Sequence, residues 1–178
     1  LQEAERPYIY TGGGIIMAEA APQLKEFAEL LGYPVTNTLM GLGGFPGTHQ
    51  QFVGMLGMHG TYEANMAMQH CDVLIAIGAR FDDRVIGNPA HFASHPRKII
   101  HIDIDPSVIS KRVKVDVPIV GDLKEILADM SAQIRSAPAR KNQAKVKAWW
   151  DQIAQWQTKD CLKYDRESQI VKPQYVVQ

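Results

Sequence analysis

Apolar residues occur in two patterns along the first 136 positions: short unbroken runs, and helical spacing. Val73–Ile77 is an unbroken run of five, which is typical of a strand covered on both faces, as in a parallel sheet. Helical spacing predicts a helix over Ala21–Leu31, with Pro22 in its first turn and Gly32 as its stop. The same reasoning predicts further strands at Pro7–Tyr10, Pro34–Thr38, Lys98–Ile104 and Val117–Val120, and further helices at Thr61–His70 and Leu123–Ile134.

This alternation of strands and helices predicts an α/β fold. Successive strand–helix–strand units give right-handed crossovers and a doubly wound, mostly parallel open sheet with helices on both faces. In such sheets, ligands bind beyond the carboxyl ends of the strands. The Gly-rich stretch Met40–Gly57 has no clear period and is predicted as one long loop. Loops of this length in a compact domain are usually functional or mobile.

Composition changes near residue 136 and divides the chain. We expect residues 1–136 to form the α/β domain, 137–172 a linker with an amphipathic helix, and 173–178 the start of a further domain. The linker helix should lie within Arg140–Asp160 and pack on this domain or on a missing neighbour. Its apolar stripe is formed by Val146, Trp149, Ile153 and Trp156. The chain does not begin with Met, so we expect it to be a piece of a longer protein.

Charge and composition exclude several classes of function. Lys+Arg and Asp+Glu both number 19, so the net charge of zero argues against nucleic-acid and anionic-membrane partners. No apolar run approaches the ~18 residues of a membrane span. Cys71 and Cys161 form no CxxC, which fits a cytoplasmic protein without a disulfide framework. The six histidines show no metal-site spacing and no GxSxG occurs, so neither a metal site nor a catalytic residue is predicted.

The strongest candidate for chemistry is Gly78–Arg84, which directly follows the buried strand. It holds two arginines and two aspartates: Arg80, Asp82, Asp83 and Arg84. A guanidinium group suits a diphosphate or stacks on an aromatic ring, and the carboxylates would orient it or meet ligand hydroxyls. The plainer alternative is a salt-bridge cluster.

Two Gly-rich segments are weaker candidates. Gly12–Gly14 follows the first strand, where glycines allow either an ordinary turn or a close backbone approach to an anion. In the long loop and just after it, Leu56, Met58 and His59 would supply the walls of an extended ligand site. The alternative for that segment is a structural Ω-type loop whose methionines fill gaps in the core.

Acidic residues also follow the last two predicted strands. Asp103 and Asp122 are placed to accept hydrogen bonds from ribose hydroxyls. Either residue would serve equally well as a helix N-cap, because Asp is a preferred residue at that position.

Three segments together resemble a known family. Met55–Thr61, Cys71–Val85 and His101–Pro106 are closely similar, in order and spacing, to the catalytic large subunit of acetohydroxyacid synthases, also called acetolactate synthases. The resemblance extends over essentially the whole chain. It implies the Rossmann-like central domain of a thiamine enzyme, which binds FAD in extended form. The family condenses pyruvate with a second pyruvate or with 2-oxobutyrate in branched-chain amino-acid biosynthesis.

The resemblance also implies the site residues. The positions that match FAD contacts of the family are Gly12, Gly13, Thr38, Leu39, Leu56, Gly57, Met58, His59, Gly78, Arg80, Asp82, Arg84, Val85, Asp103, Ile104, Asp122 and Leu123. Asp83 and Arg84 also resemble positions near the substrate channel.

Other parts of the family's machinery are missing from this chain. Thiamine diphosphate and Mg²⁺ would bind outside it, since it contains neither the family's activating glutamate domain nor its GDG…N motif. We therefore expect the chain by itself to be inactive. Its expected partners are the N- and C-terminal domains of the same subunit, further catalytic subunits in a homodimer or tetramer, and a small regulatory subunit.

Two related readings stay open at this point. The chain would also suit the central domain of a thiamine- and FAD-dependent pyruvate oxidase, in which FAD takes electrons. It would equally suit a thiamine decarboxylase whose nucleotide groove is vestigial. The segments Gly78–Arg84 and Leu56–Gly60 favour the synthase.

Overall fold

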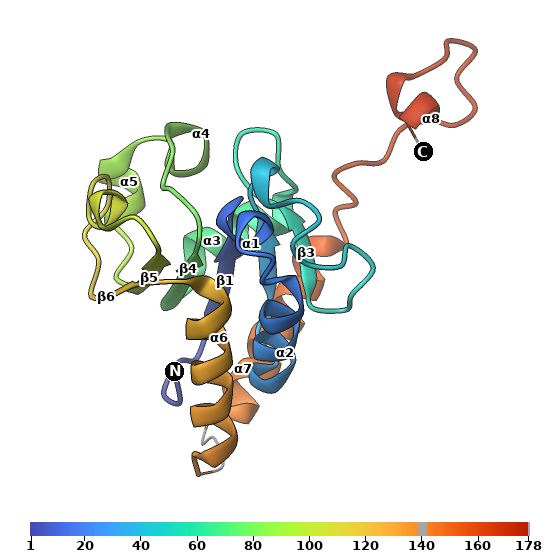
Figure 1. Ribbon diagram of the computed structural model, residues 1–178. Coiled ribbons are helices and arrows are strands. Elements are labelled where there is room, and N and C mark those ends of the chain that lie inside the picture. Colours follow the sequence, from blue (N-terminus) through green and yellow to red (C-terminus); the bar gives the residue numbers. More distant parts are fainter. Residues whose placement is uncertain (139–141, 178) are drawn as a thin grey trace.

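The computed structural model describes residues 1–138 and 142–177 and shows a single six-stranded sheet (Figure 1). Its strands are β1 (Pro7–Thr11), β2 (Val35–Asn37), β3 (Phe52–Met55), β4 (Val73–Ile77), β5 (Lys98–Asp103) and β6 (Val117–Val120). The strand order is β3-β2-β1-β4-β5-β6, and every neighbouring pair is parallel. The predicted doubly wound parallel sheet is confirmed, and its switch point lies between β1 and β4.

Helices cover both faces of this sheet (Figure 1). The α-helices are α1 (Gly14–Met17), α2 (Ala21–Leu31), α3 (Tyr62–His70), α4 (Asp83–Ile86), α5 (Pro89–Ala93), α6 (Leu123–Ser136), α7 (Gln143–Gln157) and α8 (Pro173–Val177). Two short 3₁₀ helices are η1 (Leu39–Gly41) and η2 (Pro106–Val108). Helices α2 and α6 pack together on one face, while α3 and α7 pack together on the other.

Each face has its own apolar core, and β4 shows why its sequence does not alternate. Ile75 and Ile77 point into the core formed with α2 and α6, whereas Leu74 and Ala76 point into the core formed with α3 and α7. All four are fully buried. The unbroken apolar run therefore indicates burial on both faces, as predicted.

Most predicted elements are confirmed, and local chemistry sets their ends. Helix α2 has the predicted bounds and stops at Gly32, whose φ of 67° lies in the left-handed region that favours glycine. Helix α3 begins one residue after the predicted start because Thr61 is its N-cap, with a side-chain oxygen that accepts the N–H of Ala64 at 3.3 Å.

The prediction of one continuous loop over Met40–Gly57 is wrong, because β3 and the end of η1 lie within it. Strand β3 pairs with β2 through a register shift, and its Gly54 has a φ of 101°. An irregular edge strand of four residues with a glycine inside it has no alternating pattern for sequence reasoning to detect. The segment Gly78–Arg84 is likewise shorter as a loop than expected, since α4 begins at Asp83.

The predicted amphipathic helix of the linker is α7, and it packs on this domain. Val146, Trp149 and Ile153 are buried, and Trp156 is partly buried against the core that contains Trp149 and Ile153. Trp149 Nε1 donates to the carbonyl oxygen of Pro7 at 3.0 Å, which attaches the helix to the start of β1. Residues 140 and 141, at the start of the stretch predicted as this helix, lie outside the described residues, as does residue 178, the last of the predicted start of a further domain.

Beyond α7 the chain leaves the body of the domain and ends in α8, which stands apart from the sheet (Figure 1). The domain boundaries proposed from composition stay a prediction. Among the helices of residues 1–138 and 142–177, none has the length and apolar character needed to cross a membrane.

Candidate cofactor site

The carboxyl ends of β1 and β4 approach each other so closely that glycine is required there. The N–H of Gly12 donates to the carbonyl oxygen of Ile77 at 3.1 Å, and that of Gly14 donates to Gly78 at 3.0 Å. A Cβ at Gly12 would lie 2.3 Å from the Gly78 oxygen. The structure shows a role for Gly12 that was not among the two alternatives, a tight backbone approach between β1 and the end of β4, and the contact with an anion stays a prediction. Gly13, which is half-buried, is the N-cap residue of α1.

The loop Gly78–Asp82 is held from beneath by two buried side chains. The hydroxyl of Tyr10, on β1, donates to the carbonyl oxygen of Arg80 at 2.8 Å. Nε2 of His101, on β5, donates to the carbonyl oxygen of Ala79 at 3.0 Å. Both side chains are fully buried. The loop is thus attached to both strands that flank β4.

Burial sets the protonation states of these two anchors. Desolvation raises the pKa of the Tyr10 phenol, which therefore keeps its proton. Desolvation also lowers the pKa of the His101 imidazole, which favours the neutral ring with its proton on the donating Nε2. Sequence reasoning missed both residues as parts of the site. The sequence signal that could have identified them is an aromatic ring with a polar atom, Tyr10 or His101, within a predicted strand whose other residues are mostly apolar.

The charged side chains of the loop, Arg80 and Asp82, face solvent, whereas Ala79 and Phe81 are buried. The guanidinium of Arg80 lies 3.4 Å from Oδ2 of Asp82; the side chain of Arg80 is largely exposed and that of Asp82 is about half exposed. One pair of the salt-bridge cluster considered as the alternative therefore exists, but an exposed pair of this kind contributes only about 0–1 kcal/mol. Asp83 and Arg84 are exposed in α4, while Val85 is partly buried against the core.

The second Gly-rich segment is attached to the end of this loop. The N–H of Met58 donates to the carbonyl oxygen of Arg84 at 2.9 Å, and a Cβ at Gly57 would lie 2.8 Å from that same oxygen. The side chain of Asn65 holds Gly57 from the other side, accepting its N–H at 2.9 Å and donating to its carbonyl oxygen at 3.0 Å. The side chain of Leu56 is buried in the core.

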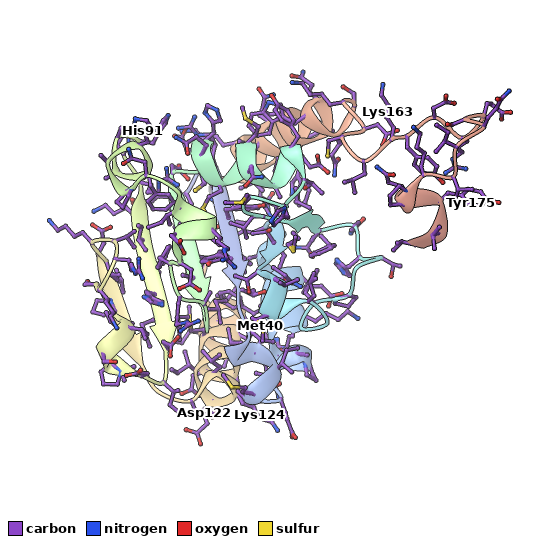
Figure 2. The ribbon with its side chains drawn as sticks, turned by 90° about the horizontal axis from the view of Figure 1, so that it is seen from above. Met40, His91, Asp122, Lys124, Lys163 and Tyr175 are labelled. Carbon is purple, nitrogen blue, oxygen red and sulfur yellow. The ribbon has the colours of Figure 1, made fainter. Side chains whose placement is uncertain are left out.

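Large apolar side chains are exposed around the same edge of the sheet. Leu39, Met58 and Ile104, which follow β2, β3 and β5, are 70%, 72% and 67% exposed. Figure 2 looks onto this edge and shows Met40, also exposed, near its middle. Thr38 fixes the start of η1 by accepting the N–H of Gly41 at 3.1 Å. Exposed apolar side chains gathered in this way indicate a surface that another group covers. His59 is exposed beside Met58.

The acidic residues at the ends of β5 and β6 already make local hydrogen bonds. Oδ1 of Asp103 accepts the N–H of Asp105 at 3.0 Å. Asp122 is the N-cap of α6 and accepts the N–H of Lys124 at 2.8 Å, so the capping alternative is confirmed for it (Figure 2). A ribose contact by Asp122 stays a prediction. Leu123, next to it, is buried.

In the described part of the chain, the predicted positions thus lie at one edge of the sheet. Comparison with known proteins assigns the chain to a family. Residues 1–130 match the model of the thiamine pyrophosphate enzyme central domain. The chain belongs to this family. The resemblance found in the sequence is thereby confirmed at the level of the family.

The whole chain is similar to acetolactate synthases of several organisms. It is 49% identical over 178 residues to the acetolactate synthase isozyme 3 large subunit of Escherichia coli (strain K12), covering 31% of that protein. It is 46% identical over 176 residues to the acetolactate synthase of Mycobacterium avium, covering 28%. It is 44% identical over 177 residues to the probable acetolactate synthase large subunit of Methanocaldococcus jannaschii, covering 29%. The chain spans less than a third of the length of these relatives.

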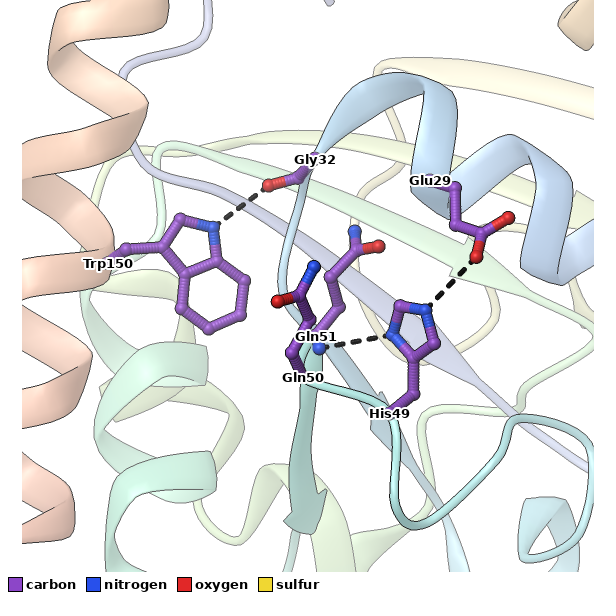
Figure 3. A pocket seen from close by; sticks show the side chains of 6 residues that line it. All are labelled: Glu29, Gly32, His49, Gln50, Gln51 and Trp150. Carbon is purple, nitrogen blue, oxygen red and sulfur yellow. Dashed lines mark hydrogen bonds and ion pairs between the residues drawn. The ribbon is translucent and has the colours of Figure 1, made fainter.

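A hollow elsewhere in this central domain has a different character (Figure 3). It has a volume of about 550 Å³ and is lined by Glu29, Gly32, His49, Gln50, Gln51 and Trp150. It lies where α2 ends and β3 begins, at the amino edge of the sheet. Nε2 of His49 lies 3.2 Å from Oε1 of Glu29, and Nδ1 accepts the N–H of Gln51 at 3.2 Å. Trp150 Nε1 donates to the carbonyl oxygen of Gly32 at 2.9 Å.

The hydrogen bonds of His49 and Trp150 indicate that the hollow results from the packing of neighbouring elements. The bonds of His49 and Trp150 connect α2, α7 and the segment before β3, so they hold packed elements together. Within residues 1–138 and 142–177, no group of three or more His, Cys, Asp or Glu side chains is arranged to hold a metal ion. The carboxyl edge of the sheet is therefore the candidate site of this central domain.

Proposed function

We propose that this chain is the FAD-holding central domain of an acetolactate synthase, which condenses pyruvate with a second pyruvate or with 2-oxobutyrate. The observation that carries the proposal is the similarity over the whole chain to proteins of that name. The family match supports thiamine diphosphate as the cofactor of the complete enzyme.

The residues at the carboxyl edge fit FAD in their chemistry. FAD has a flat aromatic ring system at each end and a diphosphate between them. Exposed apolar side chains such as Leu39, Met58 and Ile104 suit the rings, and the exposed guanidinium of Arg80 suits the diphosphate. The carboxylate of Asp103, at the end of β5, suits ribose hydroxyls. All of these residues lie at the carboxyl edge, and Arg80 follows β4, which borders the switch point where parallel sheets of this kind bind nucleotides.

In this proposal the chain holds a cofactor and leaves bond making to other parts of the enzyme. Thiamine diphosphate and Mg²⁺ would be bound by the N- and C-terminal domains of the same subunit and of a second one, in a homodimer or tetramer. Asp83 and Arg84 would lie toward the substrate channel, and a small regulatory subunit would bind elsewhere. The overall reaction involves no net redox change, so FAD would not be consumed. The isolated chain would be inactive.

The test is to purify the full-length subunit and record its absorbance in the visible range. A flavin spectrum, or stoichiometric uptake of added FAD by the colourless protein, is the expected result. A protein that is colourless and takes up no FAD would contradict the FAD assignment and favour a vestigial groove.

The same sample separates a synthase from an oxidase. Under anaerobic conditions with thiamine diphosphate and Mg²⁺, pyruvate should yield acetolactate while the flavin absorbance persists. Bleaching of the flavin that is coupled to obligatory oxidation of pyruvate would instead assign an oxidase. Boiled protein with free FAD is the control for bleaching that does not depend on the enzyme.

A further inference from the structure

Two consecutive carbonyl groups of the loop after β4 receive hydrogen bonds from buried side chains of different strands. Tyr10 Oη donates to the oxygen of Arg80, and His101 Nε2 donates to the oxygen of Ala79. Phe81 packs between these anchors, with ring centroids 5.5 Å from Tyr10 and 5.3 Å from His101. The three rings form the floor beneath the loop.

These two carbonyl groups belong to the peptide planes on either side of the Arg80 Cα atom. Each peptide unit is rigid, so fixing both planes fixes φ and ψ at Arg80. The direction in which its side chain leaves the backbone is then fixed as well. The side chain itself has little else to hold it, since it is largely exposed and its pair with Asp82 spans 3.4 Å.

We propose that Tyr10 and His101 are positioning residues that hold the backbone of the Gly78–Asp82 loop in the conformation that binds FAD. The proposal rests on the function proposed above and adds to it two residues that do not themselves touch the cofactor. Without an anchor, the loop would populate other conformations. The apparent dissociation constant for FAD then rises in inverse proportion to the fraction of molecules that keeps the binding conformation.

The chain offers a matched control in Tyr8. Tyr8 and Tyr10 both lie on β1, both are fully buried, and both donate their hydroxyl to a backbone carbonyl. The hydroxyl of Tyr8 reaches Ala64 in α3 at 3.2 Å, away from the loop. Tyr8→Phe and Tyr10→Phe therefore remove the same chemical group from the same strand, and only Tyr10→Phe releases the loop.

The first measurement is hydrogen exchange of the full-length subunit without FAD. Tyr10→Phe should speed exchange at the amides of Val85 and Ile86, whose N–H groups bond to the Asp82 carbonyl at the end of the loop. Tyr8→Phe should leave those amides unchanged. If the two variants show the same exchange at Val85 and Ile86, the proposal is overturned. This measurement decides the anchoring even if the wild-type subunit proves to bind no FAD, in which case the proposed function alone has failed.

The second measurement is FAD affinity by fluorescence titration of the same proteins. Tyr10→Phe should raise the dissociation constant roughly two- to tenfold, the effect of losing one ordinary hydrogen bond, while Tyr8→Phe matches wild type. Equal affinities for the two variants, with wild type binding FAD normally, would refute the positioning role.

His101 is tested by rescue. His101→Gln places an amide donor near the position of Nε2 and should retain most of the affinity, whereas His101→Leu removes the donor at similar volume and should weaken binding to the extent that Tyr10→Phe does. Equal losses in the glutamine and leucine variants would show that only packing matters at this position and would contradict the proposal.

Discussion

The amino and carboxyl edges of this sheet differ in whether their polar and apolar groups are already bonded within the protein or remain accessible. The amino edge holds the pocket of about 550 Å³, yet the ring nitrogens of His49 and the indole N–H of Trp150 are bonded to neighbouring protein atoms. The carboxyl edge instead presents an exposed guanidinium at Arg80 and exposed apolar side chains such as Met58. The candidate binding edge is therefore recognised by side chains that are accessible to a ligand, and the volume of a pocket does not identify it.

The edges also differ in what makes them rigid. At the amino edge, the side chains of His49 and Trp150 connect α2, α7 and the segment before β3. At the carboxyl edge the backbone is fixed instead, by glycines that allow β1 and β4 to touch and by Tyr10 and His101 beneath the loop. This arrangement leaves the surface side chains free to meet a ligand while the backbone under them is already in place. Such preorganisation reduces the ordering cost of binding.

The largest effect expected from a single substitution is at Gly12. In Gly12→Ala the new Cβ would lie 2.3 Å from the Gly78 oxygen and 2.6 Å from the Ala79 Cα, so two backbone segments must separate. We expect a loss of about 3 kcal/mol in the free energy of unfolding, the upper part of the range for overpacking, together with loss of FAD uptake. Urea denaturation and flavin absorbance of the full-length subunit measure the two.

Gly47→Ala is the matched control for that substitution. A Cβ at Gly47 would meet no heavy atom within 4 Å among the described residues, and no positive φ is recorded there. Its stability and flavin content should equal those of wild type. A Gly12→Ala protein that behaves like Gly47→Ala would show that the close approach of β1 and β4 is dispensable.

An intermediate effect is expected at Arg80, which tests whether the exposed chemistry of the carboxyl edge binds the cofactor. Arg80→Ala should weaken FAD binding by about 1.5–3 kcal/mol, since a charge-assisted contact is lost. The free energy of unfolding should barely change, because the pair with Asp82 is exposed. Titration with FAD and urea denaturation separate the two quantities.

Arg135→Ala is the control for removing a positive charge. Arg135 also forms an exposed ion pair, with Glu26, but it lies on the last turn of α6. Its loss should leave FAD affinity unchanged. Equal FAD affinity in wild type and Arg80→Ala would count against the role assigned to the guanidinium.

Sequence reasoning located the carboxyl edge because the signals for it are local. An unbroken apolar run shows where β4 lies, and the residues after such a strand must stand at the edge where ligands bind. The same reasoning gave the bounds of α2 through Pro22 and Gly32. Strand β3 was missed because its glycine and its register shift remove the alternation on which strand prediction depends.

What the sequence left open depends on contacts between distant positions. Tyr10 and Arg80 are 70 residues apart, and His101 is 22 residues from Ala79. No local sequence pattern predicts that the Tyr10 hydroxyl and the His101 ring contact the loop after β4. The role of Gly12 was undecided for the same reason, since its need for glycine arises from Gly78, in the loop that follows another strand. Contacts of this kind follow from strand order, which the alternation of elements alone does not determine.

The smallest effect is expected at the amino edge, where Glu29→Gln tests whether the pocket is only a packing feature. This change keeps the shape of the side chain but removes the charge that faces His49 Nε2 at 3.2 Å. Because Glu29 is about half exposed, the free energy of unfolding should fall by no more than ~0.5 kcal/mol. FAD affinity should equal that of wild type, since the pocket lies at the opposite edge from Arg80. A clear loss of FAD affinity in Glu29→Gln, at unchanged stability, would mean that the two edges are coupled and that the pocket is more than a by-product of packing.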